Sequence, residues 1–312
     1  MESKVESSIE SKTKDKMEIK LYNDVVFKWI FGRQEYTVPL LNLLNSVVSY
    51  EGEDPKFKDV RILNPYDQSE PFTREKQGIL DLRVQENYTG EWINLEIQVV
   101  YDADYALRSK FYLAGMYRDQ LKKNREKNYD ELKACYGIHL LVDTWFKDKK
   151  DKKQWFHHYA MLNTRTYKPL LNHWHLYYVE LKKAMNCFKK EEIKQEETGQ
   201  EQISTELETS AGLEISAELE QWSYFIGTIR DSDTPLESFL KGNTGIKEVH
   251  EMLQTFTEDD RLREQYRLHE EWLTVRLYVS EAKLAVTDLS SFITTVVLVL
   301  LPDASPDQPV NL

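Results

Sequence analysis

Hydrophobic and polar residues alternate along two neighbouring stretches of the chain, residues 79–84 and 93–99. Apolar side chains such as Leu82 and Leu95 share one face of each stretch, and polar side chains occupy the other face. An alternation with a period of two is typical of a β-strand that buries one face. Because the turn-forming sequence NYTG at 87–90 separates the two stretches, the pattern predicts a β-hairpin.

The length of the hairpin loop decides which residues face one another. A four-residue loop at 87–90 places Asp81 opposite Glu96, so that two carboxylates meet on the polar face. Like charges in such a pair destabilise a hairpin by about 0.2–1 kcal/mol, and a divalent cation between them removes the repulsion. A tight turn at Thr89–Gly90 instead pairs Arg83 with Glu96 and leaves a polar face in water. The pattern alone leaves both registers open.

The segments around the hairpin predict a mixture of helices and strands. In chain order, the predicted elements are a helix ending near Gly32, a helix from about Pro39, a strand at Val60–Leu63, the hairpin, a helix through residues 107–121, and strands at Tyr136–Val142, Trp155–Leu162 and His175–Leu181. Asn23 or Asp24 can cap the first helix, and Asp102 or Asp104 can cap the helix that follows the hairpin. The fold class expected from this order is α/β.

The chain changes in composition beyond residue 181. Residues 191–220 contain ten glutamates and one lysine, which is typical of an exposed linker. Residues 219–285 again show apolar residues at helical spacing. The apolar stripe that they form packs either in the core or against a second copy of the chain. The ten-residue apolar run at 292–301 is too short to cross a bilayer, so we expect no membrane anchor. The predicted parts are a disordered tail over 1–17, a folded domain over 18–181, an acidic linker over 182–218, a helical region over 219–285 and an atypical tail over 286–312.

Composition favours a soluble globular protein, because 41% of the 312 residues are hydrophobic and a chain of this length can bury a sizeable core. Two cysteines, Cys135 and Cys187, provide neither a disulfide framework nor a CxxC metal motif, which is typical of a reducing compartment. The first twenty residues are charged and lack the apolar core of a signal peptide. We therefore expect a cytoplasmic location.

Net charge bears on the choice of partner. The net charge of −12 by itself argues against a nucleic-acid partner. The charge is unevenly distributed, however, since residues 191–220 carry −9 and the rest of the chain carries only −3. Lysine-rich runs at 122–127 and 147–153 are the visible basic segments. Such runs are either solvated loops or contacts to phosphate, and DNA therefore remains open as a partner.

The hairpin residues resemble a known nuclease motif. Asp81, a spacer of fourteen residues and then Glu96-Ile97-Gln98 are similar to the active-site hairpin of PD-(D/E)XK nucleases, which has an acid, a spacer and then (D/E)-x-K. Leu80 stands where that motif has its proline, and Gln98 stands where it has its lysine.

The wider context narrows the resemblance to one branch of these nucleases. The sequence YNDVVFKWIFG at 22–32, the hairpin, the following helix with Arg108 and Tyr112, and the strand near YGIHLLVD together resemble the recombination-promoting nuclease/transposase family. The resemblance covers residues 19–181 and weakens toward about 285. It implies a restriction-endonuclease-like core of the order αβββαβ, with a mixed sheet flanked by helices, followed here by a helical C-terminal region.

The resemblance also implies a metal site and a substrate. Mg²⁺, or alternatively Mn²⁺, would be held by the carboxylates of Asp81 and Glu96 and by the backbone carbonyl of Ile97, with Gln98 orienting the attacking water. Asp24 is either a further ligand or only a helix cap. Arg108 and Lys28 are candidate DNA contacts, and for each the alternative is an ion pair with a neighbouring carboxylate.

Two functions follow from these expectations. The first is a metal-dependent DNA endonuclease that hydrolyses phosphodiester bonds in recombination or transposition. The second is a catalytically impaired relative that acts as a DNA-binding or protein-interaction module, and its motivation is the glutamine at the lysine position. In either case the C-terminal helices can form a homo-oligomer.

Overall fold

The computed structural model describes residues 18–49, 53–64, 82–122, 128–147, 154–187, 215–228 and 242–274. The chain forms two compact units, Met1–Tyr266 and Arg267–Leu312. The described part of the second unit, residues 267–274, is helical. The predicted tails at 1–17 and 286–312 lie outside the described residues, as does most of the predicted linker. The predicted domain boundaries stay predictions. Within the described ranges, no helix is long and apolar enough to span a membrane.

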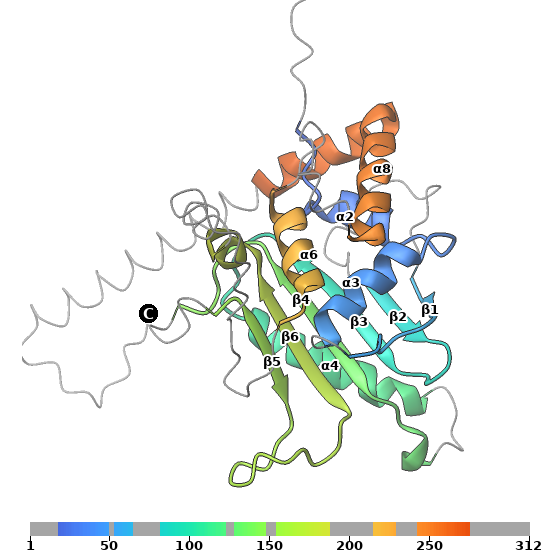
Figure 1. The fold of residues 1–312 in the computed structure, drawn as a ribbon, viewed down its shortest axis with the longest axis vertical. Helices are drawn as coiled ribbons and strands as arrows, with labels where there is room; N and C mark the ends of the chain where they lie inside the picture. Colours follow the sequence, from blue (N-terminus) through green and yellow to red (C-terminus); the bar gives the residue numbers. More distant parts are fainter. Residues whose placement is uncertain are drawn as a thin grey trace, which may run out of the picture. The chain divides into compact units, whose positions relative to one another are not determined.

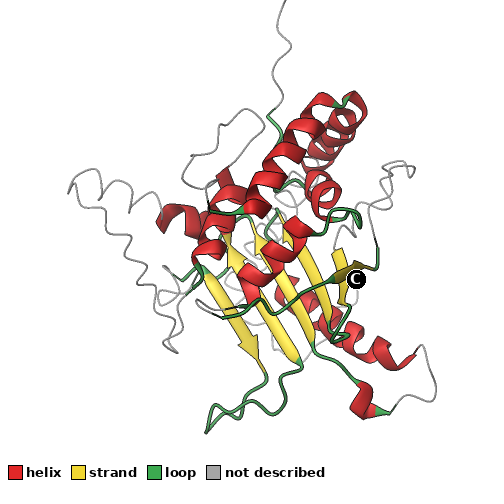
Figure 2. Ribbon diagram, turned by 45° about the vertical axis from the view of Figure 1, so that its right-hand side comes forward, coloured by secondary structure: helices red, strands yellow, loops and turns green. Residues whose placement is uncertain are grey.

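A six-stranded mixed sheet forms the centre of the first unit, with helices on both of its faces (Figure 1 and Figure 2). Its strands are β1 (Val60–Ile62), β2 (Leu82–Glu86), β3 (Trp92–Gln98), β4 (Cys135–Leu141), β5 (Phe156–Ala160) and β6 (Trp174–Glu180). They lie side by side in the order β1-β2-β3-β4-β6-β5. The central strands β3, β4 and β6 run parallel, and the outer pairs are antiparallel. The predicted mixed α/β fold is confirmed.

Strands β2 and β3 form the predicted hairpin. Leu82 pairs with Leu95 and Arg83 with Asn94, which is the register of the four-residue loop. The alternative register, in which Arg83 faces Glu96, is therefore wrong. The backbone of Gly90 has a φ of 74°, a conformation that glycine adopts without strain, so this residue allows the chain to reverse. Asp81 lies outside the described residues.

Four helices lie on one side of the sheet. They are α2 (Asp24–Phe31), α3 (Val38–Val48), α6 (Ala217–Thr228) and α8 (Thr244–Glu258). Figure 1 shows α3 and α6 in front of the strands, and α8 packs against α2 and α3. Asn23 is the N-cap of α2, because its side-chain oxygen accepts the backbone N–H of Val25 at 3.0 Å. Of the two predicted caps, Asn23 is therefore confirmed and Asp24 is wrong, because Asp24 is the first helical residue.

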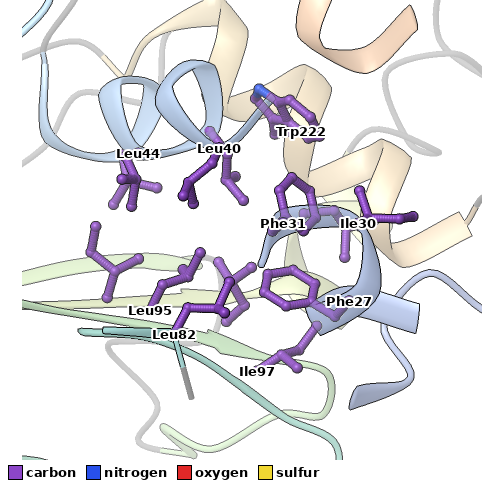
Figure 3. Close-up of a cluster of buried hydrophobic side chains, with 14 of the residues drawn as sticks. Phe27, Ile30, Phe31, Leu40, Leu44, Leu82, Leu95, Ile97 and Trp222 are labelled. Carbon is purple, nitrogen blue, oxygen red and sulfur yellow. The ribbon is translucent and has the colours of Figure 1, made fainter. Parts of the chain in front are cut away.

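The covered face of the sheet belongs to one large hydrophobic core. Figure 3 shows side chains of α2, α3 and α6 directed toward the apolar residues of the hairpin. The labelled members are Phe27, Ile30, Phe31, Leu40, Leu44, Leu82, Leu95, Ile97 and Trp222. Helix α8 adds Ile246, Val249, Leu253 and Phe256 to the same core. Because burying one large apolar side chain contributes about 1.5–3 kcal/mol, this core firmly anchors the apolar face of the hairpin.

Helix α4 (Tyr105–Lys122) covers the opposite face of the sheet (Figure 1). It packs there over a smaller apolar cluster that includes Tyr105, Leu113, Met116, Cys135, Leu141, Leu176 and Tyr178. The polar face of β3 is turned toward this helix, because residues that alternate along a strand point to opposite faces. A 3₁₀ turn at Tyr129–Glu131 and helical residues 181–187 and 260–274 complete the described elements.

Candidate active site

A row of side chains crosses four strands at the level of Glu96. On β3 and β4, Glu96 pairs with His139, and on β4 and β6, His139 pairs with Tyr178. His157 of β5 pairs with Tyr178 and completes the row. Residues paired across neighbouring strands point to the same face, so all four side chains lie on the face that α4 covers.

Two hydrogen-bonding groups meet at one oxygen of Glu96. The hydroxyl of Tyr105, the first residue of α4, donates to Glu96 Oε2 at 2.5 Å. His139 Nδ1 lies 3.2 Å from the same oxygen and 2.8 Å from the Tyr105 hydroxyl. The hydrogen bonds that Glu96 makes with the described residues all involve Oε2 and none involves Oε1, and 16% of the side chain is exposed. The carboxylate is therefore oriented through one oxygen and available through the other.

The surroundings of Glu96 keep it ionised. Burial raises the pKa of this carboxyl, but the hydrogen bond and charge interaction with His139, the hydrogen bond from Tyr105 and the nearby charge of Arg108 outweigh burial and hold the pKa below its ordinary value. Burial and the adjacent Glu96 charge raise the pKa of Tyr105 well above 10.0. At neutral pH, Glu96 is thus a carboxylate and Tyr105 is a neutral hydrogen-bond donor.

The start of α4 is built to place Tyr105. The side chain of Asp102 accepts the backbone N–H of Asp104 at 3.0 Å, and the carbonyl of Asp104 accepts the N–H groups of Leu107 and Arg108. Asp104 therefore stands at the N-cap position, one of the two predicted. The Arg108 guanidinium forms an ion pair with Asp102 at 3.0 Å and lies 5.2 Å from the centre of the Tyr105 ring. Arg108 therefore forms the ion pair that was the alternative to a DNA contact, and contact of Arg108 with DNA stays a prediction.

Gln98 and Ile97 lie at the end of β3. The amide nitrogen of Gln98 donates to the carbonyl of Val100 at 2.8 Å, and its role toward water stays a prediction. The carbonyl of Gln98 accepts the N–H of Val142, beyond β4. Because carbonyl directions alternate along a strand, the carbonyl of Ile97 points the other way, toward the side of β2. Among the described residues, β2 begins at Leu82 and does not reach the level of Ile97.

Asp24 and Lys28 both belong to α2, on the other face of the sheet. Figure 3 places Phe27 of this helix beside Ile97, so α2 passes near the end of β3. The roles of Asp24 as a metal ligand and of Lys28 as a DNA contact stay predictions.

Tyr105 and His139 were not identified from the sequence as site residues. In the sequence, the signal for His139 is an imidazole within an otherwise apolar strand. The position of this imidazole also depends on Gly137, two residues earlier. A Cβ atom at Gly137 would lie 2.9 Å from His139 Nε2 and 2.8 Å from Leu176 Cδ2, so a larger residue would displace the imidazole. For Tyr105, the signal is its position directly after the capping residue of the helix that follows the hairpin.

A second buried carboxylate lies on the same face of the sheet, at the end of β6. Oε1 of Glu180 accepts the backbone N–H groups of Trp145 at 2.6 Å and of Phe146 at 3.1 Å. Oε2 contacts Lys183 Nζ at 2.5 Å and His157 Nε2 at 3.2 Å. Both oxygens are thus occupied, and the Glu180 side chain is fully buried.

Within the described ranges, no three histidine, cysteine or acidic residues gather as a ready metal site. The predicted ligand set depends on Asp81, outside those ranges, and on a backbone carbonyl. Glu96 fits such a set, because an ionised carboxylate with one available oxygen is a normal ligand for a hard cation.

Comparison with protein families gives a match over most of the chain. The family model for PD-(D/E)XK nuclease family transposases matches residues 21–275, which include the whole sheet, α4 and the Glu96 site. No curated protein and no solved structure matches the chain.

Proposed function

The chain belongs to the PD-(D/E)XK nuclease family of transposases, and on this premise we propose that it is a metal-dependent DNA endonuclease acting in recombination or transposition. The observation that carries the proposal is the state of Glu96. This carboxylate is ionised, held through Oε2 by Tyr105 and His139, and available through Oε1. Mg²⁺ is the proposed cofactor, and Mn²⁺ is the alternative.

The proposed ligands are Glu96, Asp81 and the carbonyl of Ile97. The register Leu82–Leu95 supports this set, because the same register continued by one residue would bring Asp81 opposite Glu96. Such a pair would follow a hydrogen-bonded pair and therefore be of the non-hydrogen-bonded type, in which Cα atoms are about 4.5 Å apart and side chains are closest. Two carboxylates and a carbonyl form the all-oxygen environment that Mg²⁺ requires. Asp24 is a candidate for a further ligand.

The proposed reaction is hydrolysis of a phosphodiester bond. A bound divalent cation supplies charge neutralisation at the phosphate during this reaction. Gln98 would orient the water by hydrogen bonding, since an amide can both donate and accept. Arg108 and Lys28 are the proposed phosphate contacts, and the guanidinium of Arg108 would have to exchange Asp102 for DNA or bind both.

The finer structural assignments belong to the same proposal. Helix α2, strands β1, β2 and β3, helix α4 and strand β4 follow one another in the order expected for an αβββαβ core. Helices α6 and α8 would represent the helical C-terminal region, with self-association as a further possibility. A cytoplasmic location is proposed from the sequence composition.

The alternative function, a catalytically impaired DNA-binding or protein-interaction module, is not favoured. Such a module has no use for a carboxylate that is desolvated, ionised and oriented by two other buried side chains. Maintaining this arrangement costs desolvation free energy that a simple binding surface does not require.

Cleavage of supercoiled plasmid DNA with and without Mg²⁺ tests the proposal. We expect Glu96→Gln and Asp81→Asn to lose at least about 100-fold in cleavage rate, because each removes a charged ligand. Asp119→Asn is the matched control, since it makes the same chemical change on the exposed part of α4. Equal cleavage rates for the wild type and all three variants would overturn the proposal. Metal-independent cleavage, or DNA binding with no cleavage by the wild type, would equally exclude it.

A further inference from the structure

Two residues that contact Glu96 have no assigned role in the reaction. We infer that Tyr105 and His139 are positioning residues that restrict Glu96 to binding a cation through Oε1 alone, and that this restriction selects a small octahedral cation over Ca²⁺. The inference rests on the proposed function, because it assumes that a cation binds at Glu96.

Oε2 of Glu96 already has two hydrogen-bonding neighbours. The Tyr105 hydroxyl donates to it at 2.5 Å, and His139 Nδ1 lies 3.2 Å from it and 2.8 Å from the Tyr105 oxygen, so an N–H at Nδ1 would be shared between these two oxygens. The described residues make no hydrogen bond to the neighbouring Oε1. A cation approaching Glu96 therefore meets one available oxygen.

Neither Tyr105 nor His139 can move away from Glu96 at a low cost in free energy. Tyr105 and His139 are each 1% exposed. The His139 ring stacks on Tyr178 at 5.1 Å, and the Tyr178 hydroxyl is hydrogen-bonded to Ser109 of α4 at 2.6 Å. The arrangement thus joins helix α4 to strands β3, β4 and β6, and releasing Oε2 would require opening the packing between them.

Mg²⁺ and Ca²⁺ differ in the number and arrangement of the oxygen ligands that they take. Mg²⁺ requires six ligands at about 2.0–2.1 Å in octahedral geometry, which suits carboxylates that each supply one oxygen together with water. Ca²⁺ takes about 6–8 oxygens and frequently binds both oxygens of a carboxylate. Keeping Oε2 of Glu96 occupied removes the two-oxygen mode and disfavours Ca²⁺. Mn²⁺, which also binds in octahedral oxygen sites, should behave as Mg²⁺ does.

Calorimetric titration of the full chain with MgCl₂ or CaCl₂, in the absence of DNA, tests the inference without measuring activity. Tyr105→Phe removes one hydroxyl and keeps the buried ring, so it frees one lone pair of Oε2. We expect the ratio of Mg²⁺ to Ca²⁺ affinity to fall about tenfold in this variant, the lower end of the usual effect of losing a residue that orients a metal ligand. Loss of both affinities in Glu96→Gln shows that the measured cation is at Glu96.

A second pair of variants keeps the inference testable if Tyr105→Phe does not fold. In His139→Asn, the side-chain amide can replace Nδ1 as a donor, and in His139→Ala no donor remains. We expect the asparagine variant to retain more of the cation selectivity than the alanine variant. A purely structural role predicts instead that both variants weaken the two cations equally.

The outcomes separate the inference from the proposed function. An unchanged Mg²⁺ to Ca²⁺ ratio in Tyr105→Phe, with Mg²⁺ binding still lost in Glu96→Gln, overturns the inference and leaves the proposed function in place. An equal loss of both cations in folded Tyr105→Phe also overturns it. A wild-type chain that binds neither cation overturns both.

Discussion

Glu96 and Glu180 are two carboxylates on the same face of one sheet, and they differ in what surrounds them. Each lies 3.2 Å from a histidine of a neighbouring strand, and each has a pKa below its ordinary value. Glu180 has both oxygens occupied and a lysine ammonium at 2.5 Å, whereas Glu96 has one occupied oxygen and no lysine or arginine in direct contact among the described residues. Glu180 is fully buried, and Glu96 is 16% exposed.

The comparison shows that charge compensation, rather than burial alone, separates a structural carboxylate from a candidate ligand. Lys183 neutralises Glu180 within the fold. The backbone N–H groups of residues 145 and 146 donate to Glu180 and so attach the loop after β4 to the end of β6. The positive charge of Arg108 acts on Glu96, but Arg108 forms its ion pair with Asp102. Glu96 therefore keeps a negative charge that an external cation can compensate.

The largest expected effect is the loss of stability in Glu180→Gln. This change leaves the ammonium of Lys183 buried without its counter-charge, which typically costs about 3–5 kcal/mol. Glu96→Gln should cost only about 1 kcal/mol, because its amide oxygen can still accept from Tyr105. Urea unfolding at pH 7 measures both free energies. Equal costs for the two variants would mean that Glu96 is a structural anchor as well.

The pH dependence of stability should report the charge of Glu180. Burial raises the pKa of Glu180, but its bonds with His157, Lys183 and the backbone outweigh burial and hold the pKa below 4.5. A lowered pKa contributes stability that is complete above about pH 4.5 and is lost as the pH falls through the lower folded value.

The free-energy difference between wild type and Glu180→Gln should therefore be constant from pH 7 to about 5 and shrink below about pH 4.5. Urea unfolding at pH 7, 5, 4 and 3.5 measures it. A difference that grows toward acidic pH would show that the pKa of Glu180 is raised instead.

The smallest effect on stability is expected for Gln98→Lys, with a change within about ±0.5 kcal/mol. The lysine ammonium can replace the amide as donor to the carbonyl of Val100, and it adds a positive charge near the phosphate in the transition state. We expect metal-dependent plasmid cleavage to rise about tenfold, equivalent to about 1.4 kcal/mol. A folded variant that binds Mg²⁺ and DNA yet cuts no faster would show that Gln98 does not hold the catalytic position.

Much of the local structure follows from short-range pattern. The period-two alternation predicts β2 and β3, and the four-residue loop, one of the two loops that the pattern allows, predicts the pairing of Leu82 with Leu95. Helices α2, α3 and α4 start close to the predicted positions, because caps and Pro39 act within a few residues. The choice between Asn23 and Asp24 as cap could not be made from the pattern, since both side chains are good caps.

The contacts of Glu96 depend on pairings that sequence spacing does not determine. His139 reaches Glu96 because β3 and β4 are parallel neighbours in one particular register, although 43 residues separate the two side chains. Likewise, the sequence predicts a strand at His175–Leu181 that contains Glu180, but the partner of Glu180, His157, comes from an antiparallel neighbour 23 residues earlier.

The sequence by itself therefore determined the hairpin, the helix that follows it and the family to which the chain belongs, because these depend on residues that are close together in the chain. The structure selected one of the two hairpin registers that the pattern allows. Only the tertiary structure decided that Glu96 is held by Tyr105 and His139 and that Glu180 is neutralised by Lys183. Strand order and helix placement bring these groups together through the packing of two cores, and the free energy of that packing depends on the whole sheet rather than on any one segment.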